Sequence, residues 1–130
     1  MRFLLDTHVL LWWRQNDPRL PHRWDAILTN EAGDHEILFS LVSIWEIAIK
    51  RRIGKLRMEA TTGDFARSLV EGHGFRQISL ELNHICRMEA LPDHHRDPFD
   101  RLLIAQVLEI DAVAITDDGQ WRDYPVKVEF

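Results

Sequence analysis

Acidic residues stand at the ends of apolar runs in this chain, where carboxylates could be brought together for chemistry. They are Asp6 after Phe3-Leu4-Leu5, Glu46 between Ile44-Trp45 and Ile47-Ala48, Asp97 and Asp100 around Pro98-Phe99, and Asp117-Asp118 after Ala114-Ile115-Thr116. Apolar runs are buried on folding, so acids at their ends are carried to the edge of the core. Carboxylates that converge there repel one another, and a divalent cation removes that repulsion. Because all-oxygen ligand sets suit Mg²⁺ or Mn²⁺, the pattern predicts a metal-dependent hydrolase and favours phosphodiester substrates.

Each acid also has an ordinary structural explanation when it is taken alone. Asp6 could cap a following helix, Asp97-Pro98 is a strong helix-start signal, Ser43 and Glu46 have capping-box spacing, and Asp117-Asp118-Gly119 is a common turn sequence. The whole set favours the catalytic interpretation, because chance would have to bring every acid to one edge of one sheet.

The predicted helix cap separates the roles of two neighbouring acids. Asp97 has a complete structural role as the cap, whereas Asp100 lies one turn into the helix and is free to face a metal site. We therefore predict Asp100 as the ligand and Asp97 as an orienting or alternative group. Asp118 is favoured over Asp117 as the last ligand, although the choice stays open. Thr116 is expected to orient a neighbouring carboxylate through a hydrogen bond.

Apolar periodicity and breaker residues predict strands that alternate with helices. Strands are expected at residues 2–6, 36–40, 75–80 and 112–116, with a fifth short strand at the edge over residues 126–128. Helices are expected at residues 8–15, 21–31, 41–52, 64–71, 82–91 and 98–110. This alternation indicates an α/β fold with a mainly parallel sheet of four or five strands. Ligands bind at the carboxyl ends of the strands in such sheets, and the acids are expected at that edge.

Length and composition bound the class of protein. A chain of 130 residues is expected to form a single domain over residues 1–130. The net charge of −5 argues against a generally basic nucleic-acid surface, although Lys50, Arg51 and Arg52 open a local basic stretch. No apolar run approaches the roughly 20 residues that span a bilayer, and no secretory signal is expected. With one cysteine, Cys86, expected as a buried thiol, these features favour a cytoplasmic protein.

Motifs of several other hydrolase classes are absent from the sequence. It contains no Cys-x-x-Cys pair, His-Glu-x-x-His run, glycine-rich phosphate loop or Gly-x-Ser-x-Gly elbow. The adjacent pair His94-His95 is a poor metal site, because neighbouring histidines on a loop seldom share one ion. Zinc hydrolysis, nucleoside-triphosphate hydrolysis and serine hydrolysis are therefore disfavoured.

At these motifs the chain resembles the PIN-domain ribonucleases, specifically the VapC-type toxins of type II toxin–antitoxin pairs. The matching segments are Leu4–Trp12, Ser43–Lys50, Gly54–Leu56, Asp97–Gln106 and Ile115–Asp118, and they occur in family order and spacing along the whole chain. Each segment is a weak signal alone, but their combination is highly specific.

The resemblance implies a compact three-layer α/β/α fold with an acidic pocket that binds Mg²⁺ or Mn²⁺. By position, Asp6, Glu46, Asp100 and Asp118 match the acidic quartet of the family. The expected orienting or alternative ligands are Thr7, Ser43, Asp97, Thr116 and Asp117. The candidate contacts to the RNA backbone are Lys50, Arg51, Arg52 and Arg101.

The activity implied by the resemblance is metal-assisted hydrolysis of RNA by an endonuclease, with transfer RNA as the common target class. The resemblance also implies a homodimer and a cognate antitoxin protein, whose C-terminal segment covers the site and whose N-terminal part binds operator DNA. No membrane partner is expected.

Two alternatives come from other functional classes. One is a non-catalytic PIN-like module that acts through partners, and the complete acidic quartet argues against it. The other is a phosphatase with an aspartyl nucleophile. That chemistry typically pairs two acids in one strand-end motif, whereas Asp6-Thr7-His8 offers one.

Overall fold

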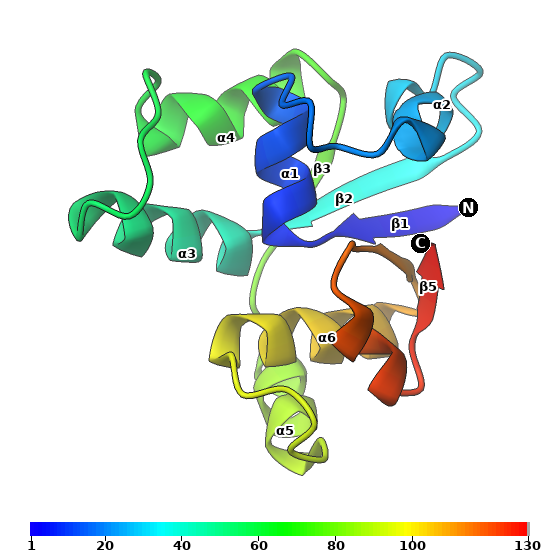
Figure 1. The fold of residues 1–130 in the computed structure, drawn as a ribbon. Helices are drawn as coiled ribbons and strands as arrows, with labels where there is room; N and C mark the ends of the chain where they lie inside the picture. Colours follow the sequence, from blue (N-terminus) through cyan, green and yellow to red (C-terminus); the bar gives the residue numbers. More distant parts are fainter. Residues whose placement is uncertain (130) are drawn as a thin grey trace.

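A five-stranded parallel sheet forms the centre of the structure, a computed structural model that describes residues 1–129 (Figure 1). The strands are β1 (Arg2–Leu5), β2 (Glu36–Ser40), β3 (Arg76–Ile78), β4 (Val113–Ile115) and β5 (Lys127–Glu129). Their order across the sheet is β3-β2-β1-β4-β5, and every neighbouring pair is parallel. The predicted α/β class with a parallel sheet is confirmed, and the expected edge strand lies within one residue of β5.

Helices cover both faces of this sheet. They are α1 (Thr7–Arg14), α2 (Asp25–Thr29), α3 (Leu41–Arg52), α4 (Thr62–Glu71), α5 (Leu82–Ala90) and α6 (Pro98–Ile110), with short 3₁₀ helices η1 (His22–Trp24) and η2 (Gly119–Asp123). Helices α1, α2 and α4 lie on one side, and α5 and α6 lie on the other (Figure 1). Within the described residues, no helix combines the length and the apolarity that crossing a bilayer requires.

Successive strand residues point to opposite faces and build two cores. On β1, Phe3 and Leu5 pack with residues of α1, α2 and α4, whereas Leu4 packs with residues of α6. All three side chains are buried, which is why the strand is apolar throughout instead of alternating with polar residues. Two cores on either side of one sheet confirm the expected three-layer α/β/α architecture.

One helix is shorter than the periodicity predicted. The helix expected over residues 21–31 is a 3₁₀ turn followed by the five-residue α2, which ends where Asn30 adopts a left-handed conformation with φ of 52°. Asparagine tolerates this conformation better than most residues. Trp24 and Leu28 are nevertheless buried, and Ile27 packs against the same core, so the apolar residues of this segment face the sheet.

The single cysteine lies at the surface. Cys86 on α5 is exposed, which contradicts the expected buried thiol. Helix α5 packs against the core through other positions, where His84 is buried and Met88 is partly buried. Because α5 is amphipathic, one of its faces packs against the core, and the exposed Cys86 lies outside that face.

The sheet changes its direction of winding between β1 and β4. The chain passes from β1 to β2 and β3 on one side, whereas β4 and β5 lie on the other side. Such a switch point opens a crevice at the carboxyl ends of the two strands. Leu5 and Ile115 are paired in register at these ends, so the residues that follow them emerge side by side.

Arg101 ties the loop between α5 and α6 to the start of α6. Its guanidinium donates hydrogen bonds to the carbonyl oxygens of Met88, Leu91 and Pro92 at 3.1, 3.2 and 2.9 Å. It also lies 3.4 Å from the hydroxyl of Tyr124, and its side chain is 11% exposed. This clamp fixes the loop over residues 91–97, and it leaves few donors for an external ligand.

Arg101→Lys is expected to lower the free energy of unfolding by about 2 kcal/mol, because one ammonium cannot satisfy several carbonyl oxygens that a planar guanidinium reaches together. Arg52→Lys, at an exposed position of α3, is expected to change the stability by less than about 0.5 kcal/mol. Urea unfolding followed by circular dichroism measures both effects. Equal stability of the two variants would contradict the clamp.

Candidate metal centre

Four of the predicted acids lie together at the edge where β1 and β4 end. Asp6 follows β1, Asp118 follows β4, Glu46 lies in the second turn of α3 and Asp100 lies in the first turn of α6. Asp100 is close enough to the other three, and to Asp97, to be affected by their negative charges. The structure thus brings together the acids that the sequence placed at one edge, while their metal binding stays a prediction.

Asp6 serves the fold and faces the cluster with the same carboxyl group. One oxygen accepts a hydrogen bond from the N–H of Val9 at 2.9 Å and caps α1, and the other accepts one from the hydroxyl of Thr116. Burial raises the pKa of Asp6 above its usual value, although the hydrogen bonds from Thr116 and Val9 oppose this effect. The nearby charge of Asp118 raises the pKa further.

Thr116 links the ends of β1 and β4. Its buried hydroxyl donates to the carboxylate of Asp6 and accepts from the N–H of Asp118 at 3.0 Å. One side chain therefore positions two of the acids. These contacts are those of the orienting group that the sequence led us to expect.

Glu46 is buried on α3 and paired with a lysine one turn later. The Nζ of Lys50 lies 2.6 Å from Oε2 of Glu46. Helix α3 begins at Leu41 and is capped by Ser40. Ser43 is therefore not the cap of α3, so Glu46 cannot complete a capping box with it, and helix capping does not explain this acid.

A buried hydrogen bond joins the helices that carry Asp6 and Glu46. The hydroxyl of Thr7 donates to the hydroxyl of Ser43 at 2.9 Å, and both side chains are buried. This bond fixes the first turn of α1 against the first turn of α3. Thr7 and Ser43 can thus orient the neighbouring acids without being ligands themselves.

The carboxyl group of Asp100 is also placed where ionisation is unfavourable. Burial, followed by the charges of Asp97, Asp6, Glu46 and Asp118, raises the pKa of Asp100 to about 8. Such a group keeps its proton at neutral pH until a positive charge approaches it. A bound cation would restore the ionised form.

The two alternative ligands have partners outside the cluster. Asp97 caps α6 by accepting a hydrogen bond from the N–H of Phe99 at 2.9 Å. Asp117 is about half exposed, and its carboxylate lies 3.4 Å from the guanidinium of Arg23. The geometry therefore favours Asp100 and Asp118 over their neighbours.

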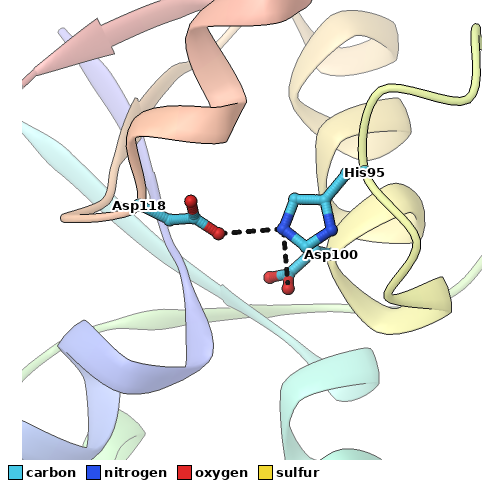
Figure 2. Close-up of side chains that lie close together, drawn as sticks. All are labelled: His95, Asp100 and Asp118. Atoms are coloured by element: carbon cyan, nitrogen blue, oxygen red, sulfur yellow. Dashed lines mark hydrogen bonds and ion pairs between the residues drawn. The ribbon is translucent and has the colours of Figure 1, made fainter.

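His95 belongs to this cluster, although the pair His94-His95 was set aside in the sequence as a poor metal site. Its Nε2 lies 2.8 Å from Oδ2 of Asp118 and 3.3 Å from Oδ2 of Asp100, so the ring stands between the two carboxylates (Figure 2). His95 stands two residues before the cap Asp97, in a loop whose path local patterns do not specify, so the sequence could not show that it faces the acids.

The donor set fits a divalent cation that prefers oxygen ligands. Among the described residues, atoms of His95, Asp100 and Asp118 that could act as ligands lie within 4.8 Å of one another. Burial, together with the charges of neighbouring acids, raises the pKa of Asp6 and of Asp100, and the cation nearest to Glu46 is its ion-pair partner Lys50. Carboxylate oxygens in this arrangement suit Mg²⁺ or Mn²⁺.

The family model described as the PIN domain matches residues 3–127, a range that includes all four acids. The chain belongs to the PIN-domain family. Among curated proteins, no sequence matches it significantly.

Several solved structures share the fold of this PIN domain. A chain of VapBC2 from Rickettsia felis, bound to a DNA fragment from its promoter, has a TM-score of 0.74 and 13% identity, with 99% of this chain and 98% of that chain covered. A chain of FitAcB from Neisseria gonorrhoeae has a TM-score of 0.69 and 16% identity, with 98% and 96% covered. A chain of DNA-bound VapBC from Salmonella typhimurium has a TM-score of 0.61 and 14% identity, with 99% and 97% covered. At such identities the similarity shows the fold.

A hollow of about 270 Å³ opens beside the acids of this PIN domain. It is lined by Asp6, Asp117 and Asp118, and by His8 and Trp12 from α1. The His8 and Trp12 rings lie 6.0 Å apart between centroids. A larger hollow of about 430 Å³ lies elsewhere and includes none of the four acids. The smaller one is the relevant opening, because two of the four acids, Asp6 and Asp118, line it beside aromatic side chains.

The basic residues predicted to contact RNA are placed differently from one another. Lys50, Arg51 and Arg101 donate hydrogen bonds within the protein. Arg52 is exposed, and no hydrogen bond or ion pair joins its side chain to another described residue. Arg96, which sequence reasoning missed, is exposed between His95 and the α6 cap. Arg52 and Arg96 are thus better placed for an external anion than Arg101.

The metal-free protein is expected to lose stability as the pH rises from about 4 to about 8. The folded state keeps the proton of Asp100 up to a pKa of about 8, whereas an unperturbed aspartate releases it near 3.8. The folded state therefore binds more protons in this interval, and its advantage is lost as the pH rises through the folded pKa. Thermal unfolding in EDTA across this pH range measures the effect.

Asp100→Asn is the matched variant for that measurement. It is expected to flatten the pH dependence and to stabilise the metal-free protein at pH 8 by about 2 kcal/mol. This is less than the whole shift, because water and salt reach the edge of the cluster. An unchanged pH dependence in the variant would show that Asp100 does not carry the effect.

Proposed function

We propose that this PIN domain is a metal-dependent endoribonuclease, the toxin component of a type II toxin–antitoxin pair. The observation that carries the proposal is the cluster of buried and half-buried carboxylates at the switch point of the sheet, in which the pKa of Asp100 is raised to about 8. Acids arranged against their own repulsion are characteristic of functional sites, and the family membership makes a nuclease the natural assignment.

The four carboxylates would hold the cation, and neighbouring groups would keep them in position. Asp6, Glu46, Asp100 and Asp118 are the proposed ligands of Mg²⁺ or Mn²⁺. When bound, the ion supplies Lewis-acid activation of water and neutralises charge on the phosphate. Thr116 orients the acids at the two strand ends, and the hydrogen bond between α1 and α3 keeps those helices in register.

Single-stranded or looped RNA fits the access to this centre, and the loops of transfer RNA belong to that class. A base beside the scissile phosphate can stack on Trp12 in the hollow next to Asp6 and Asp118. Exposed Arg52 and Arg96 are proposed contacts to neighbouring phosphates. Because the net charge is −5, these contacts must be local and cannot come from a generally basic surface.

An antitoxin partner and a second copy of the chain complete the proposal. The antitoxin is supported by structural relatives that are VapBC and FitAcB proteins, two of them described as bound to DNA. The second copy is supported by an exposed apolar stripe on α3, formed by Trp45, Ile49 and Ile53 at one-turn spacing. Their exposed fractions of 52, 37 and 59% are high for such large apolar side chains.

Cleavage of total cellular RNA tests the activity and the ligand assignment together. Antitoxin-free protein with Mn²⁺ is expected to produce discrete fragments, and EDTA is expected to abolish them. Asp118→Asn should reduce the initial rate by about 100-fold or more, whereas Asp117→Asn should stay within about threefold of the wild type. The two positions form a matched pair, because they are adjacent and Asp118 contacts His95 whereas Asp117 contacts Arg23.

Three outcomes would contradict parts of the proposal. Equal losses in the two folded variants would refute the choice of Asp118. Intact RNA in the presence of folded, Mn²⁺-binding protein would favour the non-catalytic, partner-binding alternative. Cleavage that persists in EDTA and in Asp6→Asn would indicate a contaminating nuclease and remove support for an enzyme.

The proposed phosphate contacts are tested by RNA binding in an inactive Asp100→Asn background. Arg52→Ala and Arg96→Ala are each expected to weaken binding and to reduce the slope of log affinity against log salt by about 0.7. Lys127→Ala is the control, because Lys127 is exposed at the opposite end of the strands. Fluorescence anisotropy with a labelled RNA stem-loop gives the slopes. Slopes unchanged by both arginine substitutions would place the RNA elsewhere.

A further inference from the structure

His95 is buried in the loop between α5 and α6, with 8% of its surface exposed, and both ring nitrogens make polar contacts. Nδ1 lies 3.2 Å from the backbone nitrogen of Asp97. Nε2 lies 2.8 Å from Oδ2 of Asp118 and 3.3 Å from Oδ2 of Asp100 (Figure 2). One edge of the ring is thus held by the backbone, and the other edge faces the candidate metal centre.

These contacts assign the hydrogen of the ring to one nitrogen. A backbone N–H can only donate, so Nδ1 must accept from Asp97 and carries no hydrogen. The hydrogen is then on Nε2, where it donates to the carboxylate of Asp118. Every contact of the ring is satisfied in this tautomer.

A ring in this tautomer can orient metal ligands, but it cannot itself coordinate the metal through Nε2. To coordinate a cation, Nε2 would have to lose its hydrogen, and Nδ1 would then present a donor to the N–H of Asp97. We infer that His95 is a positioning residue, which holds Asp118 beside Asp100 in the orientation that metal binding needs. The inference rests on the metal-dependent function proposed above.

The surrounding structure holds both partners of this hydrogen bond in place. The N–H of His95 donates to the hydroxyl of buried Tyr124 at 2.8 Å, and that hydroxyl donates to the carbonyl oxygen of Pro92 at 2.7 Å. The other oxygen of Asp118 accepts from the N–H of Gln120 at 2.9 Å. With Gln120 on one oxygen and His95 on the other, the carboxylate of Asp118 has little freedom to rotate.

Two amide substitutions separate the two edges of the ring. In His95→Gln, the side-chain amide reaches the position of Nε2 and can still donate to Asp118. In His95→Asn, the shorter amide reaches the position of Nδ1, keeps an acceptor for the N–H of Asp97 and leaves Asp118 without its donor. The pair therefore tests the positioning contact against the structural one.

Mn²⁺ affinity is the readout, measured without RNA from the electron paramagnetic resonance signal of free Mn²⁺. His95→Gln is expected to bind within about threefold of the wild type, whereas His95→Asn is expected to bind about 10- to 100-fold more weakly. Equal affinities in all three proteins would overturn the inference. A loss of more than about tenfold in folded His95→Gln would overturn it too, even if His95→Asn does not fold.

Spectroscopy of the Mn²⁺-loaded wild type separates positioning from coordination. Electron spin-echo envelope modulation detects an imidazole nitrogen that is bound directly to the ion, and no such coupling is expected. A strong nitrogen coupling that disappears in His95→Gln would overturn the inference and make His95 a ligand.

Different experimental results would contradict the role of His95 and the proposed function. Absence of Mn²⁺ binding by the folded wild type would contradict the proposed function and, with it, the role of His95. A wild type that binds Mn²⁺ and cleaves RNA, with equal affinities in both variants, would remove the role of His95 and leave the nuclease assignment in place.

Discussion

The concentration of negative charge where β1 and β4 end is the constraint on which the rest of this structure depends. The pKa of Asp100 is raised to about 8 because burial and the charges of four neighbouring acids oppose its ionisation. A fold that holds such groups together without a counter-charge gives up stability. The parallel sheet, the capped helices and the Arg101 clamp hold the rest of the structure in place around these carboxylates, which repel one another.

Helix capping and site chemistry are combined in the same side chains. Asp6 caps α1 with one oxygen and Asp118 caps η2 with one oxygen, so each carboxylate is held by a backbone N–H while its second oxygen faces the cluster. A cap fixes the side-chain conformation before any ligand binds. The structural role of these acids, which in the sequence competed with the catalytic interpretation, is therefore the means by which they are oriented.

The fold could be predicted from the sequence because its signals are local. Helices over residues 41–52 and 98–110 begin and end where expected, since their caps and apolar spacing lie in adjacent residues. The proximity of the acids could be predicted because the carboxyl ends of parallel strands lie at the same edge of a sheet. The place of His95 could not be predicted, because it depends on a loop path and on Tyr124, 29 residues away. The internal use of Arg101 likewise depends on carbonyl groups that the folded loop alone brings near.

The hydrogen bond between Thr116 and Asp6 joins residues 110 positions apart. The two strands whose ends form the crevice, β1 and β4, therefore come from distant parts of the chain. Contacts between such distant segments form late, because the intervening chain must first be closed into a loop. The acidic centre of this domain is therefore assembled late in folding, and a chain in which β1 and β4 have not yet paired has no crevice between them.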